Sequence, residues 1–313
     1  MTIPEIKNGA RVTQADVKLA CDAGALIVRG VVQPEELDVL QNETMDVINY
    51  MSREQPQGEG EWFYNSEGIP YRIHWMGEKM KSYVPFLGNP RLLQAIEALC
   101  GERFLPVSTH TMVFKLENSG AEVPWHRDWQ YIPEGAEGFW DWSNFPIAAM
   151  SMALDPYTEE TSMYIVPGSH KWEYEEAMVM RKKLQNPFNT EGAVPAILKP
   201  GDMLIHNHLV LHGSWKTSGA MRRGLQCSYW SEALIDFAQK CDPDYDLEID
   251  HKKRMLAACV WRRLFCDYAR GEVPYLPKGM SLEQHPLSTD ERVGSPAWKF
   301  KQFSHQEVAA GVS

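Results

Sequence analysis

The chain of 313 residues contains 44% hydrophobic and 23% charged residues, which is typical of a globular protein with a sizeable buried core. Its formal net charge of -11 argues against an electrostatic nucleic-acid partner or a polybasic membrane surface. The sequence lacks a run of about 18 apolar residues, a secretory signal and any CxxC pair among its six cysteines. We therefore expect a cytoplasmic protein with reduced thiols that binds neither nucleic acid nor membrane.

The N-terminal third has the pattern of a helical layer, residues 1–103. Apolar spacing, glycines and prolines predict, in chain order, a helix, a strand, a second helix, a loop and a third, amphipathic helix. These segments are Gln14–Ala23 ending at Gly24, Ala25–Arg29, Pro34–Tyr50, residues 52–69, and Pro90–Cys100 closed by Gly101.

The sequence pattern changes near Phe104, where short apolar runs begin to alternate with turn residues. This pattern predicts a β-sandwich or barrel core over about residues 104–232. A helix over His251–Tyr268 is expected in a C-terminal extension, residues 240–313, and we treat the whole chain, 1–313, as one domain. The predicted strands are Phe104–Val107, Thr109–Leu116, Ile147–Leu154, Met163–Val166, Ala196–Leu198, Asp202–His206 and Gly224–Trp230.

An HxD pair, His126 and Asp128, is the first candidate for chemistry. Residues two apart in a strand project to one side, so this imidazole and carboxylate can share a metal ion. His212 follows a later apolar run, and two histidines with one carboxylate favour iron(II) with open coordination positions. Taken alone, an HxD pair is common by chance and indicates a metal site only weakly.

Further motifs occur before and after the HxD pair in a fixed order. They are GALIVRGVVQPEEL at Gly24–Leu37, HTM at His110–Met112, WHRDWQYIP at Trp125–Pro133, YIVPGSHKW at Tyr164–Trp172, KPGDMLIH at Lys199–His206, LHGS at Leu211–Ser214, and the pair Arg222-Arg223. In these motifs, over roughly residues 22–232, the chain resembles the phytanoyl-CoA dioxygenase family of Fe(II)/2-oxoglutarate-dependent oxygenases.

The resemblance implies a mainly β fold with flanking helices, a double-stranded β-helix (jelly roll). It also implies that His126, Asp128 and His212 bind Fe(II), with 2-oxoglutarate as cosubstrate and O2 as oxidant. Ser214 and one arginine match the family's contacts to the distal carboxylate of 2-oxoglutarate, which a planar guanidinium binds through two charge-assisted hydrogen bonds. Aligning the following strand selects Arg222 and counting from His212 selects Arg223, and we prefer Arg222.

Several other positions allow two interpretations. Met112 and Met150 match positions that line the cosubstrate, but core packing explains a strand methionine equally well. His206 and His208 compete with His212 as the distal ligand, although the HGS context fits only His212. Hydrogen bonding within the turn is the favoured role of His170.

The region 125–145 is unusually aromatic. Its rings form a wall for a flat or hydrophobic substrate in one interpretation, and close a loop over the core in the other. Candidate substrate contacts are Arg127, Trp129, Tyr131 and Trp140, with a solvent-facing Arg127 as the favoured alternative. The clusters Trp62–Tyr64 and Tyr71–Trp75 either pin a long loop to the surface or add substrate contacts.

These observations predict an Fe(II)- and 2-oxoglutarate-dependent dioxygenase that hydroxylates, desaturates or cyclises a small-molecule metabolite, in keeping with a role in biosynthesis. The carboxylate at Asp128 favours hydroxylation over halogenation, because related halogenases lose it so that chloride can bind iron. The alternatives are a cupin-like metal enzyme that does not use 2-oxoglutarate and a non-catalytic β-sandwich ligand-binding protein. The primary substrate and the oligomeric state, including a homodimer, are left open.

Overall fold

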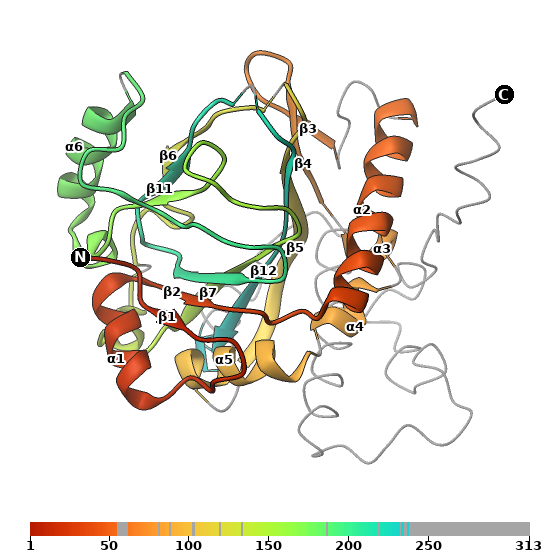
Figure 1. Cartoon of the computed structure of the whole chain (residues 1–313). Coiled ribbons are helices and arrows are strands. Elements are labelled where there is room, and N and C mark those ends of the chain that lie inside the picture. Colours follow the sequence, from red (N-terminus) through yellow and green to blue (C-terminus); the bar gives the residue numbers. More distant parts are fainter. Residues whose placement is uncertain are drawn as a thin grey trace, which may run out of the picture.

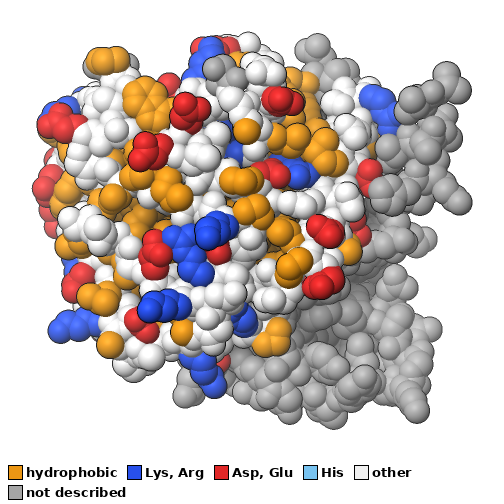
Figure 2. All heavy atoms as spheres, viewed as in Figure 1, with side chains coloured by type: hydrophobic (Ala, Val, Ile, Leu, Met, Phe, Trp, Pro, Cys, Tyr) orange, Lys and Arg blue, Asp and Glu red, His pale blue; other side chains and the backbone are white. Residues whose placement is uncertain are grey.

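The computed structural model describes residues 1–54, 62–74, 76–80, 82–87, 89–101, 104–118, 120–132, 134–185, 187–217, 219–231, 233–234 and 237. The expected helix over His251–Tyr268 lies outside these residues. Within them, none of the helices is both long enough and apolar enough to span a bilayer. On the described part of the face in Figure 2, basic and acidic side chains are interspersed, so this face presents no strong field of one sign.

The predicted N-terminal helices are present, and local sequence explains their ends. Helix α1 (Gln14–Ala23) starts with a capping box between Thr13 and Asp16 and stops at Gly24, whose φ of 81° is left-handed. Helix α2 (Pro34–Glu54) is one turn longer than expected, and α5 (Pro90–Cys100) begins at the Asn89 cap. The shorter helices are α3 (Met76–Lys79) and α4 (Tyr83–Leu87).

Two sheets face each other in a jelly roll (Figure 1). The larger sheet has the order β1-β2-β10-β7-β12-β5-β4-β3, and the smaller one has the order β6-β11-β8-β9. In chain order the strands are β1 (Glu5–Ile6), β2 (Ala25–Val28), β3 (Trp62–Tyr64), β4 (Pro70–Ile73), β5 (Phe104–Lys115), β6 (Val123–His126), β7 (Ile147–Ala153), β8 (Tyr164–Ile165), β9 (Val194–Pro195), β10 (Met203–Asn207), β11 (His212–Ser214) and β12 (Arg222–Ser231).

The larger sheet separates a hydrophobic core from an inner cavity. Helices α1, α2 and α5 cover its outer face (Figure 1), and the main apolar cluster lies between them and the sheet. Met112, Met152 and Leu225 point into this cluster, and strand alternation turns their chain neighbours towards the smaller sheet. The sheet therefore places a row of side chains opposite β6 and β11.

Three differences from the sequence prediction have physical reasons. Helix α6 (Tyr174–Gln185) was not predicted, because only Ala177 and Leu184 of its residues are buried and no apolar stripe marks it. The segment Ala196–Leu198 is not a strand, and Leu198 makes only an isolated bridge to Tyr157. The presumed loop at 52–69 contains the end of α2 and all of β3, which pairs with β4. Two short 3-10 helices, Glu137–Phe139 and Ser169–Lys171, complete the described elements.

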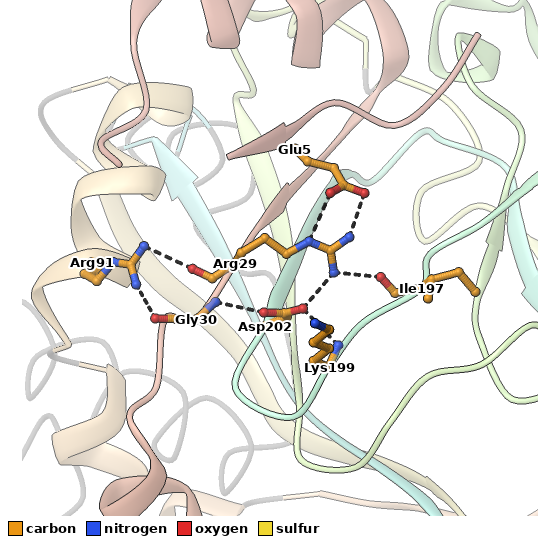
Figure 3. A network of polar contacts seen from close by, with 7 residues as sticks. All are labelled: Glu5, Arg29, Gly30, Arg91, Ile197, Lys199 and Asp202. Carbon is orange, nitrogen blue, oxygen red and sulfur yellow. Dashed lines mark hydrogen bonds and ion pairs between the residues drawn. The ribbon is translucent and has the colours of Figure 1, made fainter. Parts of the chain in front are cut away.

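The GD motif fixes the start of β10 (Figure 3). The Asp202 carboxylate accepts hydrogen bonds from the Gly30 amide (2.8 Å) and the Lys199 amide (2.9 Å), and it pairs with Arg29 (2.7 Å). Arg29 also pairs with Glu5. This network ties β1, β2 and β10 together, so the motif has a structural role away from the metal ligands. Its members are Glu5, Arg29, Gly30, Arg91, Ile197, Lys199 and Asp202.

Candidate active site

Strand pairing in the smaller sheet brings the three candidate metal ligands together. His212 on β11 is the register partner of His126 on β6, and Asp128 lies two residues beyond His126. The Asp128 Oδ1 atom lies 3.8 Å from His126 Nε2 and 3.9 Å from His212 Nε2. One potential ligand atom from each residue lies within 4.8 Å of the others, a spacing that a single metal ion can bridge with little adjustment.

Backbone carbonyls orient both imidazoles. His126 Nδ1 lies 2.7 Å from the Pro124 oxygen, and His212 Nδ1 lies 3.0 Å from the Val210 oxygen. A carbonyl can only accept, so each Nδ1 donates its proton and leaves the Nε2 lone pair for a metal. Chain geometry therefore presets the tautomer that a metal site needs.

Electrostatics favour the same protonation states. Burial lowers the pKa of His126 and of His212 to about 4, so both rings are neutral near pH 7. Burial raises the pKa of Asp128. The surrounding histidines, His212 foremost, lower it by a larger amount, so the pKa of Asp128 lies below the usual value of an aspartate. The cluster thus presents two lone pairs and a carboxylate.

Gly213 explains why a small residue follows the distal histidine. A Cβ atom there would lie 3.1 Å from the Trp125 ring and 3.2 Å from the Trp125 backbone. Trp125 is fully buried and stacks on Phe188 with ring centroids 5.5 Å apart. A side chain at position 213 would therefore crowd Trp125 where β11 pairs with β6.

The three ligands border a cavity of about 270 Å³ between the two sheets. Its wall mixes polar and apolar side chains, and among the lining residues are two arginines, four histidines and Asp128. The lining residues are Tyr71, Arg72, Thr111, Val113, Val123, His126, Asp128, Trp129, Ala149, Met150, Met163, His206, His208, His212, Gly213, Ser214, Arg222, Gln226, Cys227 and Ser228.

The two consecutive arginines of β12 have different environments. Arg222 lines the cavity, is 2% exposed, and its guanidinium carbon lies 4.1 Å from the Tyr157 ring centroid. Its Nε atom is buried and has no hydrogen-bond partner in the described structure. Arg223 points away from the cavity, where Asp155 binds it through two hydrogen bonds of 2.8 Å.

Ser214, like Arg222, has a buried polar atom without a hydrogen-bond partner among the described residues. Its Oγ atom is buried at the cavity wall without a hydrogen-bond partner in the described structure. Unpaired buried polar atoms are costly in a native protein and are commonly explained by a ligand or a water molecule. Ser214 lies on the smaller sheet and Arg222 on the larger one, so the cavity has an unpaired polar atom on each of its two sheets.

The structure corrects two of the sequence expectations for this site. Met112 lies in the outer core and not at the cavity, because strand alternation turns its neighbours Thr111 and Val113 inward instead. Arg127 is neither solvent-facing nor at the cavity: it is 5% exposed and donates to the carbonyls of Ser169 and Trp172. Met150 belongs to the outer core but also borders the cavity.

Three aromatic residues after the HxD pair differ in their position relative to the cavity. Trp129 lines the cavity, and its backbone amide donates to the His208 oxygen (3.1 Å). Trp140 does not line it but packs behind Trp129, with ring centroids 5.9 Å apart. Tyr131 is 68% exposed and does not line the cavity either. Only Trp129 of these three therefore lines the cavity.

The remaining histidines differ in their contacts and in whether they line the cavity. His170 lies outside the cavity, and its Nε2 atom is 2.9 Å from the Cys21 oxygen, which is a structural role. His206 and His208 line the cavity beside the cluster, and His208 Nε2 lies 2.9 Å from Ser228 Oγ. Sequence reasoning did not single out Thr111, Gln226 and Ser228 as cavity residues, although alternation along β5 and β12 was the signal that could have found them.

Comparisons with known proteins agree with this arrangement. A protein from Danio rerio described as phytanoyl-CoA dioxygenase domain-containing protein 1 is 24% identical over 260 residues, which cover 67% of this chain and 87% of that protein. The crystal structure of AviO1 from Streptomyces viridochromogenes Tue57 matches with a TM-score of 0.55 and 23% identity, over 72% of this chain and 97% of that one.

EctD from S. alaskensis, crystallised with 2-oxoglutarate and 5-hydroxyectoine, matches with a TM-score of 0.54 and 16% identity, over 74% of this chain and 80% of that chain. At these identities the two structural matches show a shared fold. The sequence profile of the family described as Phytanoyl-CoA dioxygenase (PhyH) matches residues 20–224, which include every residue of the candidate metal cluster and both arginines. The chain therefore belongs to the phytanoyl-CoA dioxygenase family.

Proposed function

We propose that the protein is an Fe(II)- and 2-oxoglutarate-dependent oxygenase that oxidises an unactivated C–H bond of a small-molecule metabolite, with hydroxylation as the favoured outcome. The observation that carries the proposal is the combination of the His126/Asp128/His212 cluster with the unpaired polar atoms of Arg222 and Ser214 in one cavity. Family membership and the EctD complex with 2-oxoglutarate support the same class of enzyme.

The donor set suits iron(II). Two neutral imidazoles and one carboxylate form the ligand set of non-haem Fe(II) oxygenases, which leave coordination positions open for cosubstrate and oxygen. A closed structural metal site would instead supply a fourth protein ligand. In the described residues the metal-binding cluster has only these three members.

The cavity wall also suits 2-oxoglutarate. Arg222 offers a rigid pair of donors to the distal carboxylate, and Ser214 offers a hydroxyl beside it. The Tyr157 ring holds the guanidinium by stacking, without the acidic partner that would neutralise it. Arg223 is already occupied by Asp155, and this leaves Arg222 as the anchor.

When bound, iron and 2-oxoglutarate would react with O2, whose one oxygen atom enters succinate as carbon dioxide is released and whose other oxygen atom would oxidise the substrate. The protein orients the participants: Pro124 and Val210 fix the imidazoles, Arg222 fixes the cosubstrate, and Trp129 limits the place of the C–H bond. Retention of Asp128 favours hydroxylation over halogenation, since the carboxylate keeps the position that a halide would take.

Succinate formation from 2-oxoglutarate with Fe(II) and O2, together with the visible charge-transfer band of the anaerobic Fe(II)–2-oxoglutarate complex, tests the proposal. The Asp128→Ala variant is expected to lose both signals. Asp22→Ala removes an exposed carboxylate that pairs with Lys171, and it is expected to behave like the wild type. Absence of both signals in the wild-type protein would sink the proposal. A band without any turnover would favour a metal protein that does not oxidise with 2-oxoglutarate.

A further inference from the structure

Lys115 is a buried basic residue next to the proposed cosubstrate anchor. It is the last residue of β5, it is 1% exposed, and Arg222 at the start of β12 is its register partner. Register partners on neighbouring antiparallel strands project from the same face of a sheet, with Cβ atoms roughly 5 Å apart. Thr111 and Val113 of β5 line the cavity, and alternation turns Lys115 towards the same side. Two buried basic side chains therefore lie side by side on the inner face of the larger sheet.

Two backbone carbonyls hold the Lys115 amino group. Its Nζ atom donates to the oxygens of Ala121, which lies just before β6, and of Trp215, which directly follows β11. The same two segments are joined by two backbone hydrogen bonds of 3.0 Å between Gly120 and Thr217. One side chain therefore ties the end of β5 to the segments that enter β6 and leave β11, and these are the two strands that carry the histidine ligands.

An acidic partner for Lys115 is absent among the ion pairs of the described residues. Glu122 is the acid that acts on it, and the Glu122 carboxylate also accepts a hydrogen bond from Gln185. The charged and titratable side chains on the elements around Lys115 are Arg222 on β12, Tyr157 stacked on Arg222, Arg72 on β4, Glu117 and Glu122 between β5 and β6, and Lys216 after β11.

These surroundings disfavour the charged form of Lys115. Burial first, and then the charge of Arg222, lower the pKa of Lys115 to about 7, although Glu122 raises it. Without cosubstrate the side chain is therefore largely neutral above pH 7. A neutral amine still has two N–H donors, one for each carbonyl, so the change of charge breaks neither hydrogen bond. Both charge states fit the same arrangement of the chain.

A carboxylate bound at Arg222 would reverse this preference, because an opposite charge within a few ångströms favours the charged form of a group. We propose that Lys115 is a positioning residue of the cosubstrate site, which fixes the segments beside Arg222 and takes up a proton from solvent when 2-oxoglutarate binds. The proposal rests on the proposed function, because it takes Arg222 as the anchor of the distal carboxylate. The proton returns to solvent when the cosubstrate leaves.

Proton uptake gives the binding of 2-oxoglutarate a definite pH dependence. A group that is protonated only in the complex weakens binding as the pH rises above the pKa of its free form, here about 7. If the cosubstrate raises this pKa by one unit, the affinity should fall about 5-fold between pH 6.5 and pH 8.5, and binding at pH 8 should take up about 0.4 proton. Calorimetric titration of the oxygen-free, Fe(II)-loaded protein with 2-oxoglutarate, in two buffers of different ionisation enthalpy, measures this proton count.

Two variants of Lys115 separate its charge from its titration. An arginine stays charged at every pH of the experiment, so Lys115→Arg should keep tight binding and lose both the proton uptake and the pH dependence. Lys115→Met should lose them as well and should bind 2-oxoglutarate about 10-fold more weakly at pH 6.5. Lys216→Met is the matched control: it removes an exposed ammonium that pairs with Glu67, and it should keep the wild-type proton count.

The proposal is overturned if the wild type takes up no proton, or if either Lys115 variant keeps the wild-type proton count. Weaker binding by Lys115→Met with an unchanged proton count would leave Lys115 a structural role alone. The wild-type measurement decides the matter even where a variant does not fold. Failure of the proposed function gives a different result, because the Fe(II)-loaded wild type would then bind no 2-oxoglutarate at any pH.

Discussion

Arg222 and Arg223 are consecutive in the chain, yet their guanidinium groups lie on opposite faces of β12. Arg222 lines the cavity and stacks on Tyr157, and Arg223 is held by Asp155 beneath α2. Side chains alternate along a strand, so a shift of one residue would exchange the cavity-lining arginine for the one that pairs with Asp155. The pairing of Arg222 with Lys115 and of Arg223 with Phe114 fixes this register.

Substitutions of the two arginines should therefore have different effects on cosubstrate binding and on stability. Arg222→Leu is expected to raise the 2-oxoglutarate requirement by about 100-fold or more, because it removes a charge-assisted pair of bonds to a carboxylate, while stability changes little. Steady-state succinate assays across 2-oxoglutarate concentrations measure the first effect, and thermal unfolding measures the second.

Arg223→Leu is the matched control. It leaves the Asp155 carboxylate without its partner and should lower the free energy of unfolding by about 3–5 kcal/mol, with little change in the 2-oxoglutarate requirement of the folded fraction. If the two phenotypes are exchanged, the assignment of Arg222 as the anchor is wrong.

Gly224 and Tyr157 provide a second test of the cosubstrate wall. A Cβ atom at position 224 would lie 2.1 Å from the Tyr157 hydroxyl oxygen, so Gly224→Ala must displace the ring on which Arg222 stacks. We expect a stability loss of about 1–3 kcal/mol and weaker 2-oxoglutarate binding. The same substitution should cost less in a Tyr157→Phe background, since the clashing oxygen is gone.

Tyr157→Phe alone should change little, because the hydroxyl lies 3.5 Å from the Arg223 oxygen and makes only a weak contact. A double-mutant cycle on unfolding free energies measures the coupling. Additive effects of the two substitutions would show that the ring does not transmit the change at Gly224.

Local signals in the sequence predict much of the fold. Helices α1 and α5 carry an apolar stripe and end at a glycine, and their bounds agree with the prediction. Helix α6 has neither signal, because most of its residues contact solvent and only Ala177 and Leu184 are fully buried. Periodicity alone cannot find such a helix, since tertiary contacts determine it.

The residues around the cavity depend on strand register and on long-range contacts as well as on local motifs. The order of motifs placed His126, Asp128 and His212 in one candidate cluster, and the structure brings them together. The facing of Met112 depends on the register of β5 against β12, which no short motif encodes. The role of Arg127 depends on a contact with the turn at Ser169, 42 residues away, and such long-range contacts are not readable from spacing.

Arg127 is predicted to be a stability residue that secures the HxD segment. Its guanidinium donates to the carbonyl oxygens of Ser169 and Trp172, which lie in the turn before α6. Arg127→Met should lower the unfolding free energy by about 2 kcal/mol or more and weaken iron retention without abolishing it, since the ligands remain. Arg53→Met removes a guanidinium whose one hydrogen bond among the described residues goes to Asn49 of its own helix, and it should change stability by less than about 0.5 kcal/mol. Equal effects of the two variants would restore the solvent-facing interpretation of Arg127.

Stability of the metal-free protein should fall as the pH is lowered from 6.5 towards 4. Burial lowers the pKa of His170 from 6.5 to about 4, and the same holds for His126 and His212. Between these values the unfolded chain binds protons that the folded protein excludes, so the stabilisation is present above pH 6.5 and is lost as the pH falls through this window. His170→Gln removes one such group away from the metal cluster. The loss of unfolding free energy between pH 7 and pH 5 should then shrink by about 2 kcal/mol relative to the wild type, as measured by urea denaturation at the two pH values. Parallel pH profiles for the two proteins would mean that His170 accepts a proton in the folded state as readily as in the unfolded chain.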